Sequence, residues 1–198
     1  MKNIFIVLTA LLLGASGCQQ EQQGGTGEKD YVQFKLNGQP VRIEGCLGQH
    51  NSRLKVDLRS GSESYKLSGN VTKCDANSPH IEMSQSSTSP LTTRNYEATA
   101  QMDAFEWTSF EYDTTYVSSQ AGGKAFIFRP NDYDLSSLGN IEITAIEPRV
   151  GGVVKGKFSF QNIWYYDYGS ATNYWVEGGH TITEGEFQFV VAYIDTVR

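Results

Sequence analysis

Apolar and polar residues alternate one by one along much of the chain from Tyr31 onward. The clearest stretch is LKVDLR, in which Leu54, Val56 and Leu58 are separated by charged residues. A period of two places successive side chains on opposite faces, so it predicts a strand with one buried and one solvated face. The pattern recurs in VQFKL, VRIE, NIEITA, KFSF and EFQFV. No window of a dozen residues carries a convincing helical stripe, although a short helix over residues 98–104 stays open.

Turn-forming residues separate these runs. Asn37 and Gly38 lie between the first two, and both tolerate the positive φ of a type I′ turn, so they predict a hairpin. Further turn clusters occur at GSES, ANSP, SSTSP, AGG, NDYD, RVGG and YGSATN. Strand after strand at this spacing predicts an all-β fold, a single antiparallel β-sandwich or barrel-like domain over residues 31–198. A segment of about 168 residues is long enough for one domain with a sizeable core.

The first 17 residues have the layout of a secretory signal, with Lys2 before an uncharged apolar run and small residues after it. The run is shorter than the about 20 residues that a membrane-spanning helix needs. The tetrapeptide ASGC, residues 15–18, resembles the lipobox of bacterial lipoproteins, except that Ala15 stands where leucine is usual. The resemblance implies that the Cys18 thiol carries a lipid and that Cys18 begins the mature protein. An ordinary signal peptide cut near Gly17 is the alternative.

Residues 18–30 predict a flexible tether, because QQEQQGGTGEKD contains no aliphatic or aromatic residue that could form a core. Acyl chains on Cys18 would supply membrane attachment. We therefore expect a cell-envelope protein, lipid-anchored at the outer membrane and facing the periplasm or the exterior. Without Lys2 the mature part keeps 15 of the 16 basic residues against 22 acidic ones, and a negative chain of this kind is not expected to bind nucleic acid.

Two segments resemble a group of small lipoproteins from Bacteroidetes. IEITAIEPRVGGVVKGKFSF followed by HTITEGEFQF is similar to the group's closing strands, of the forms GxFSF and ITEGxF, and FKLNGQPV is similar to its opening hairpin. The resemblance implies the fold and the envelope location. It implies no catalytic residue, because the group has no assigned activity.

Cys46 and Cys74 are the two thiols that remain besides Cys18. In an exported chain they predict a disulfide, with free thiols as an alternative. A third possibility is zinc, because His50 and His80 follow the cysteines at C-x3-H and C-x5-H spacing. We expect no metal and no cofactor.

Three weaker patterns suggest catalysis or ion binding. GGVVKGK, residues 151–157, has the spacing of a phosphate loop, but Phe158 follows where Ser or Thr is needed, so a hairpin turn is expected instead. Glu184 and Glu186 would share one face of a strand and suggest a carboxylate hydrolase, the least favoured function. Asn131, Asp132 and Asp134 supply oxygens suited to calcium, yet they lack the glycine and distal glutamate of a calcium loop.

The segment NIWYYDYGSATNYW is the richest in aromatic residues. We call it the aromatic hairpin; its six members are Trp164, Tyr165, Tyr166, Tyr168, Tyr174 and Trp175. Alternation sends some of these rings into the core, and the rest would form a flat surface for sugar rings or a protein partner. The sequence therefore predicts a non-enzymatic binding module for a glycan or protein partner. The alternative is a structural or accessory lipoprotein of an outer-membrane assembly, with every ring buried.

Overall fold

The computed structural model describes residues 27–58, 63–74, 79–98, 108–115, 124–128, 138–167 and 175–198. Strands joined by turns and loops make up this part of the chain, and it contains no helix. The strands are β1 (Tyr31–Leu36), β2 (Gln39–Glu44), β3 (Ser52–Asp57), β4 (Ser64–Thr72), β5 (His80–Ser87), β6 (Asn95–Ala98), β7 (Thr108–Thr115), β8 (Lys124–Phe128), β9 (Leu138–Ile146), β10 (Val153–Asp167) and β11 (Trp175–Val197). The all-β prediction is confirmed. A helix of the length and apolar character needed to cross a membrane is not found in these ranges.

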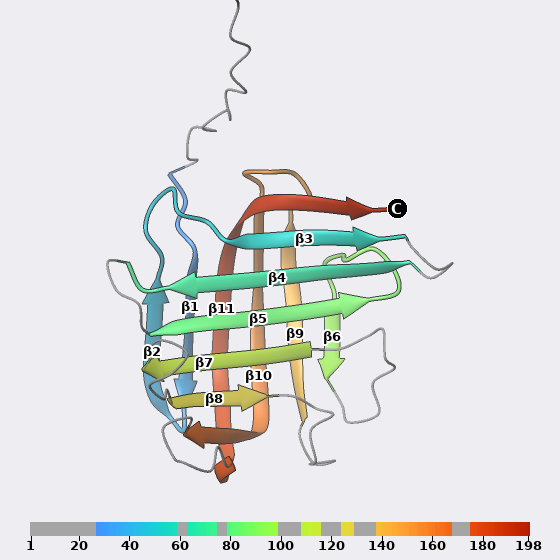
Figure 1. Ribbon diagram of the computed structural model, residues 1–198. Helices are drawn as coiled ribbons and strands as arrows, with labels where there is room; N and C mark the ends of the chain where they lie inside the picture. Colours follow the sequence, from blue (N-terminus) through green and yellow to red (C-terminus); the bar gives the residue numbers. More distant parts are fainter. Residues whose placement is uncertain are drawn as a thin grey trace, which may run out of the picture.

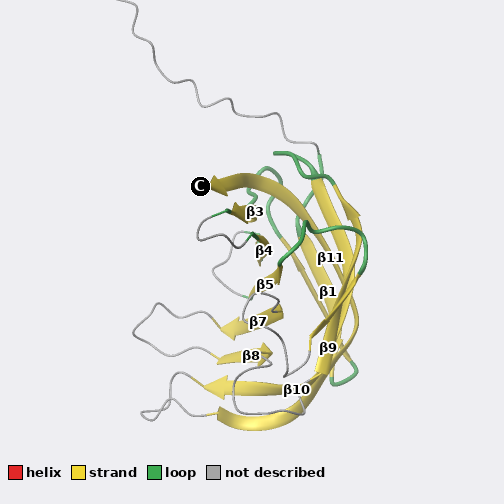
Figure 2. Cartoon of the chain, turned by 90° about the vertical axis from the view of Figure 1, so that its right-hand side faces the viewer, coloured by secondary structure: helices red, strands yellow, loops and turns green. Residues whose placement is uncertain are grey.

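The strands form two layers that face each other across the core (Figures 1 and 2). The first layer holds β2, β1, β11, β10, β9 and β6, and β3, β4, β5, β7 and β8 run crosswise in the second. β11 pairs with β1 and β10 and then with β3, while β10 pairs with β11 and β9 and then with β8. Hydrogen bonding is therefore continuous around the second layer and back through β10 and β11, which agrees with the sandwich or barrel-like prediction. β11 and β3 are parallel, and the other described strand pairs are antiparallel.

Bulges bend the long strands. The register between β10 and β11 shifts at four places, two of which lie around Asn162 and Glu184. Both residues have left-handed backbone, with φ of 55° and 52°. An extra residue in one strand of a pair increases the local twist and bends the strand. The bulges therefore help β10 and β11 to turn from the first layer into the second, as their curved ribbons in Figure 1 show.

The predicted hairpin between β1 and β2 is present. Asn37 and Gly38 form its two-residue turn, with φ of 49° and 81°. LKVDLR also contributes to a strand as expected, but β3 ends at Asp57 and Leu58 is 38% exposed. The open alternative of a short helix over residues 98–104 falls almost wholly outside the described residues, since only Ala98, at the end of β6, is described there.

Core phenylalanines lie directly over glycines of other strands. A Cβ atom placed on the glycine would come within 2.1 to 2.7 Å of the facing ring in four such pairs. The pairs are Gly69 with Phe189, Gly156 with Phe187, Gly139 with Phe160, and Gly185 with Phe158. These glycines therefore serve close approach between ring and backbone. Gly156 and Gly185 belong to the GxFSF and ITEGxF motifs, so the motifs have a packing role.

Candidate functional site

Cys46 and Cys74 form the predicted disulfide, with their Sγ atoms 2.07 Å apart. The bridge ties the segment that follows β2 to the segment that follows β4. The zinc alternative is wrong, because the two thiols are bonded to each other and His50 and His80 each contact a different carboxylate. No group of three side chains suited to a metal ion occurs among the described residues.

The phosphate-loop pattern belongs to a turn and a strand. Gly151, with φ of 75°, lies in the turn between β9 and β10, and β10 begins at Val153. A phosphate loop needs a helix N-terminus after its glycines, where backbone N–H groups point at the phosphate. The turn interpretation is therefore confirmed.

The two carboxylates suggested for hydrolysis are engaged by neighbours on β1. Glu184 Oε1 lies 2.7 Å from Lys35 Nζ, and Glu186 accepts a hydrogen bond of 2.7 Å from Gln33 Nε2. Both contacts join β11 to its partner strand. They give each carboxylate a role in strand pairing.

Two histidine–carboxylate pairs lie elsewhere in the fold. Asp30 and His50 are 3.0 Å apart, and burial raises the pKa of Asp30. His80 and Asp113 are 2.9 Å apart, and the hydrogen bond to Asp113 raises the pKa of His80. Together with His50 and Asp30, Ser52 supplies the three residue types of a serine–histidine–aspartate triad. However, its side chain is fully buried and its Oγ makes no hydrogen bond with a described group. A substrate could not reach this hydroxyl, so the set does not form a nucleophilic site.

The aromatic hairpin divides between the two faces of the sheet. Tyr165 points inward, where its ring lies 5.0 Å from that of Phe126 and 6.4 Å from that of His180. Trp164 and Tyr166 alternate with Tyr165 and pair with residues of β8 on the outer face. All three predicted binding residues are half-buried.

Trp164 packs against Gly178 of β11. A Cβ atom at Gly178 would be 3.2 Å from three carbons of the indole, so the ring lies flat over the glycine. Opposite it on β8 is Ile127, which is 3% exposed. The indole thus has a packing role and also retains exposed surface.

Several predicted residues lie outside the described part of the chain. They are Cys18, Asn131, Asp132, Asp134, Tyr168 and Tyr174, and the side chain of Trp175. The backbone of Trp175 pairs with Tyr166 in the β10–β11 hairpin.

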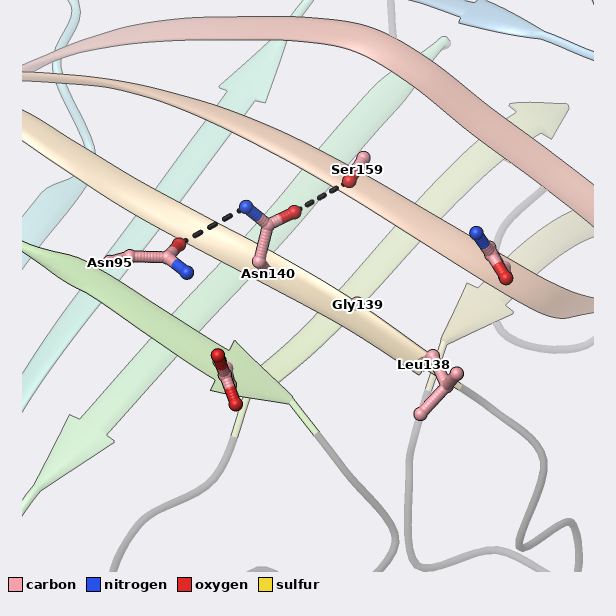
Figure 3. Close-up of a pocket in the computed structure, with 7 residues that line it drawn as sticks. Asn95, Leu138, Gly139, Asn140 and Ser159 are labelled. Carbon is pink, nitrogen blue, oxygen red and sulfur yellow. Dashed lines mark hydrogen bonds between the residues drawn. The ribbon is translucent and has the colours of Figure 1, made fainter.

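An open groove that the sequence did not predict lies on the outer face of β6, β9 and β10 (Figure 3). Its volume is about 340 Å³, within the roughly 300–1,000 Å³ usual for small-molecule sites. The lining is polar except at two positions; the residues are Asn95, Glu97, Leu138, Gly139, Asn140, Ser159 and Gln161. The polar residues at alternate positions of β9 and β10 could have suggested a polar surface on these two strands. Its assembly was not predictable, because β6 joins β9 across 45 residues of sequence in the Asn95–Asn140 hydrogen bond.

Beyond the groove, β10 runs on into the aromatic hairpin. Ser159 and Gln161 alternate outward on this strand, and Trp164 and Tyr166 take the outer face beyond the bulge at Asn162. Gln161 and Trp164 are three positions apart, which is at most about 10 Å along a strand. The same outer face of β10 therefore carries polar and aromatic side chains in sequence.

Comparison with known protein families, with curated protein sequences and with solved structures finds no match to this chain. The resemblance to Bacteroidetes lipoproteins stays a prediction.

Proposed function

We propose that this protein is a lipid-anchored module of the cell envelope that binds a glycan without transforming it. The observation that carries the proposal is the outer face of β10, where Ser159 and Gln161 of the groove are followed along the strand by Trp164 and Tyr166. Polar groups that exchange hydrogen bonds with hydroxyls, followed by aromatic surface, match the two kinds of surface on a sugar.

The position of the groove suits a protein tethered by Cys18. Gly139 lies in a strand-crossing row with Phe160, Ile182 and Leu36, the last residue of β1. The tether joins β1 at its other end, Tyr31, about 17 Å away along the strand. With a lipid on Cys18, the groove would lie at the end of the layer that is farther from the membrane. A ligand beyond the membrane surface could then reach it.

The known contacts of the acidic and nucleophilic groups support binding over catalysis. Glu184 and Glu186 are occupied by Lys35 and Gln33, and Ser52 is buried. A protein partner on the same face is the runner-up.

The binding part of the proposal is tested with the full chain, purified in detergent and applied to a glycan array. We expect glycan capture by the wild type and its loss in the double variant Gln161→Ala/Tyr166→Ala. Thr144→Ala is the matched control, since Thr144 is exposed on β9 and does not line the groove. Capture of an envelope protein with no glycan signal would favour the runner-up instead.

The anchoring part is tested by Cys18→Ser. We expect no labelling with radioactive palmitate and recovery in the soluble fraction, whereas the wild type is labelled and sediments with membranes. Undiminished label in the variant would show that the anchor lies elsewhere.

A further inference from the structure

We infer that the groove on β6, β9 and β10 is a subsite for one uncharged sugar ring, held by hydroxyls on opposite sides of the ring. This inference rests on the proposed glycan-binding function and adds the class of sugar and the residues that select it.

A hydrogen-bonded chain crosses the floor of the groove in one direction (Figure 3). Ser159 Oγ donates to Asn140 Oδ1 at 2.5 Å, and Asn140 Nδ2 donates to Asn95 Oδ1 at 3.1 Å. The chain leaves the Nδ2 group of Asn95 as a donor at the β6 side and the oxygen lone pairs of Ser159 as acceptors at the β10 side. These two ends lie two strand spacings apart, on β6 and β10. A hydroxyl both donates and accepts, so two hydroxyls on opposite sides of one sugar ring match a donor at one end and an acceptor at the other.

Glu97 and Gln161 flank the chain. Neither side chain makes a hydrogen bond or ion pair with another described residue, and both are exposed. Glu97 lies opposite Asn140 on the neighbouring strand and lines the same groove. A carboxylate can accept hydrogen bonds from two hydroxyls, and such charge-assisted bonds are the strong ones.

On β1, β2 and β11, the other half of the outer face of this layer, polar side chains already bond to one another. Arg42 donates to Gln33, which donates to Glu186, while Lys35 pairs with Glu184. Of the two halves, the one with the groove therefore keeps polar groups available to a ligand.

Leu138 supplies an apolar rim. Its side chain is 48% exposed at the edge of the groove, opposite Gln161. A pyranose ring has C–H faces as well as hydroxyls, and contact with an exposed leucine would cover one of these faces. The combination of an apolar rim with a row of amides therefore suits a sugar ring better than a purely polar ion.

The charge of the groove selects against acidic sugars. Glu97 is the single ionisable residue among its lining side chains. A uronate or sulfate would bring a second negative charge close to this carboxylate with no cation in the lining to balance it. Uncharged sugars avoid the repulsion, which gives the subsite its selectivity.

The test is nuclear magnetic resonance titration of the full chain in detergent micelles with methyl glycosides. The probes are the methyl pyranosides of glucose, galactose and mannose, their neutral disaccharides, and methyl glucuronide as the acidic counterpart. We expect a neutral glycoside to shift the amide signals of Gly139 and Asn140 and the glucuronide to bind more weakly. Glu97→Gln should weaken binding about tenfold, the loss expected when a hydrogen bond to a charged group is replaced. Leu138→Asp should weaken it as well.

Glu142→Gln is the matched control, because Glu142 is an exposed carboxylate on β9 that faces outward but does not line the groove. Wild-type affinity in this control, with loss in Glu97→Gln, supports the inference. If neutral sugars bind but Glu97→Gln and Leu138→Asp bind equally well, or if acidic sugars bind more tightly, the subsite is wrong while glycan binding stands. If neither the probes nor a glycan array gives binding, the proposed function fails together with the inference.

Discussion

Substitution of Gly69 by alanine should destabilise the fold through a single ring. A Cβ atom at this position would lie 2.1, 2.3 and 2.5 Å from three carbons of Phe189. The ring cannot easily move aside, because Phe189 is 1% exposed and stacks on Phe187 with 4.9 Å between ring centroids. The variant therefore forces a displacement in a closely packed core.

The magnitude follows from two opposing effects. Overpacking of a core costs about 1–3 kcal/mol, and three contacts this short place Gly69→Ala at the upper end. Replacing glycine by alanine recovers about 0.5–1 kcal/mol, because the unfolded chain loses less freedom on folding. We expect a net loss of about 2 kcal/mol in the free energy of unfolding. For a domain of this size the melting temperature should fall by about 4–8 °C.

Urea denaturation of paired variants measures the effect. Gly45→Ala is the matched control, since its nearest non-bonded heavy atom would be 3.6 Å from the new Cβ, an ordinary contact. It should be neutral or slightly stabilising. In the double variant with Phe189→Leu, the cost of Gly69→Ala should shrink, with a coupling energy of about 0.5–3 kcal/mol. The packing argument is refuted if Gly69→Ala costs no more than Gly45→Ala, or if the two changes are additive.

Three further changes test other parts of the fold. Glu184→Gly should stabilise the domain by about 1 kcal/mol in urea melts, because glycine adopts the left-handed bulge without the penalty of a side chain; a loss of stability would show that the contacts of the carboxylate outweigh the strain. Loss of the Cys46–Cys74 bridge, which spans 28 residues, should cost about 3.5 kcal/mol in the chain-entropy model, and an unchanged melt after reduction would contradict this. Burial raises the pKa of Asp30, so the folded state holds the carboxyl proton of Asp30 more tightly than the unfolded chain does. The stability that this gives is complete below the unfolded pKa and is lost as pH rises through the folded pKa. Asp30→Asn keeps an acceptor for Val190 N–H and should gain stability over the wild type as pH rises in melts at stepped pH, whereas a constant difference would show that ionisation of Asp30 carries no cost.

Local sequence patterns predicted the strands because each pattern reports on burial of its own segment. VQFKL, LKVDLR and EFQFV became parts of β1, β3 and β11. Burial alternates along β1, whereas in β11 Gln188 and Val190 are buried together with Phe187 and Phe189. Asn37 and Gly38 predicted their turn because a positive φ is a property of single residues. The parallel pairing of β11 with β3 depends on contacts between residues more than a hundred positions apart. A local pattern carries no information of that kind, so the parallel pair was not predictable.

The binding surface was less predictable than the strands. The aromatic hairpin was found from composition, but composition could not tell that Trp164 lies over Gly178, because this contact depends on the register between β10 and β11. The groove was not found at all. Its polar residues look like ordinary solvent-facing positions until β6 is placed beside β9, and the signal for that placement lies in a pairing between distant segments.

Gly139 links the packing of the core to the shape of the groove. Its backbone lines the groove on the outer face, while on the inner face a Cβ atom would be 2.3 Å from the ring of Phe160. That ring is fully buried and stacks on Phe128, with 4.4 Å between their centroids. The floor of the groove is thus held from below by a closely packed ring. Because rigid elements position binding groups more precisely than loops, Asn140, the next residue, projects from a backbone whose place is set by the core.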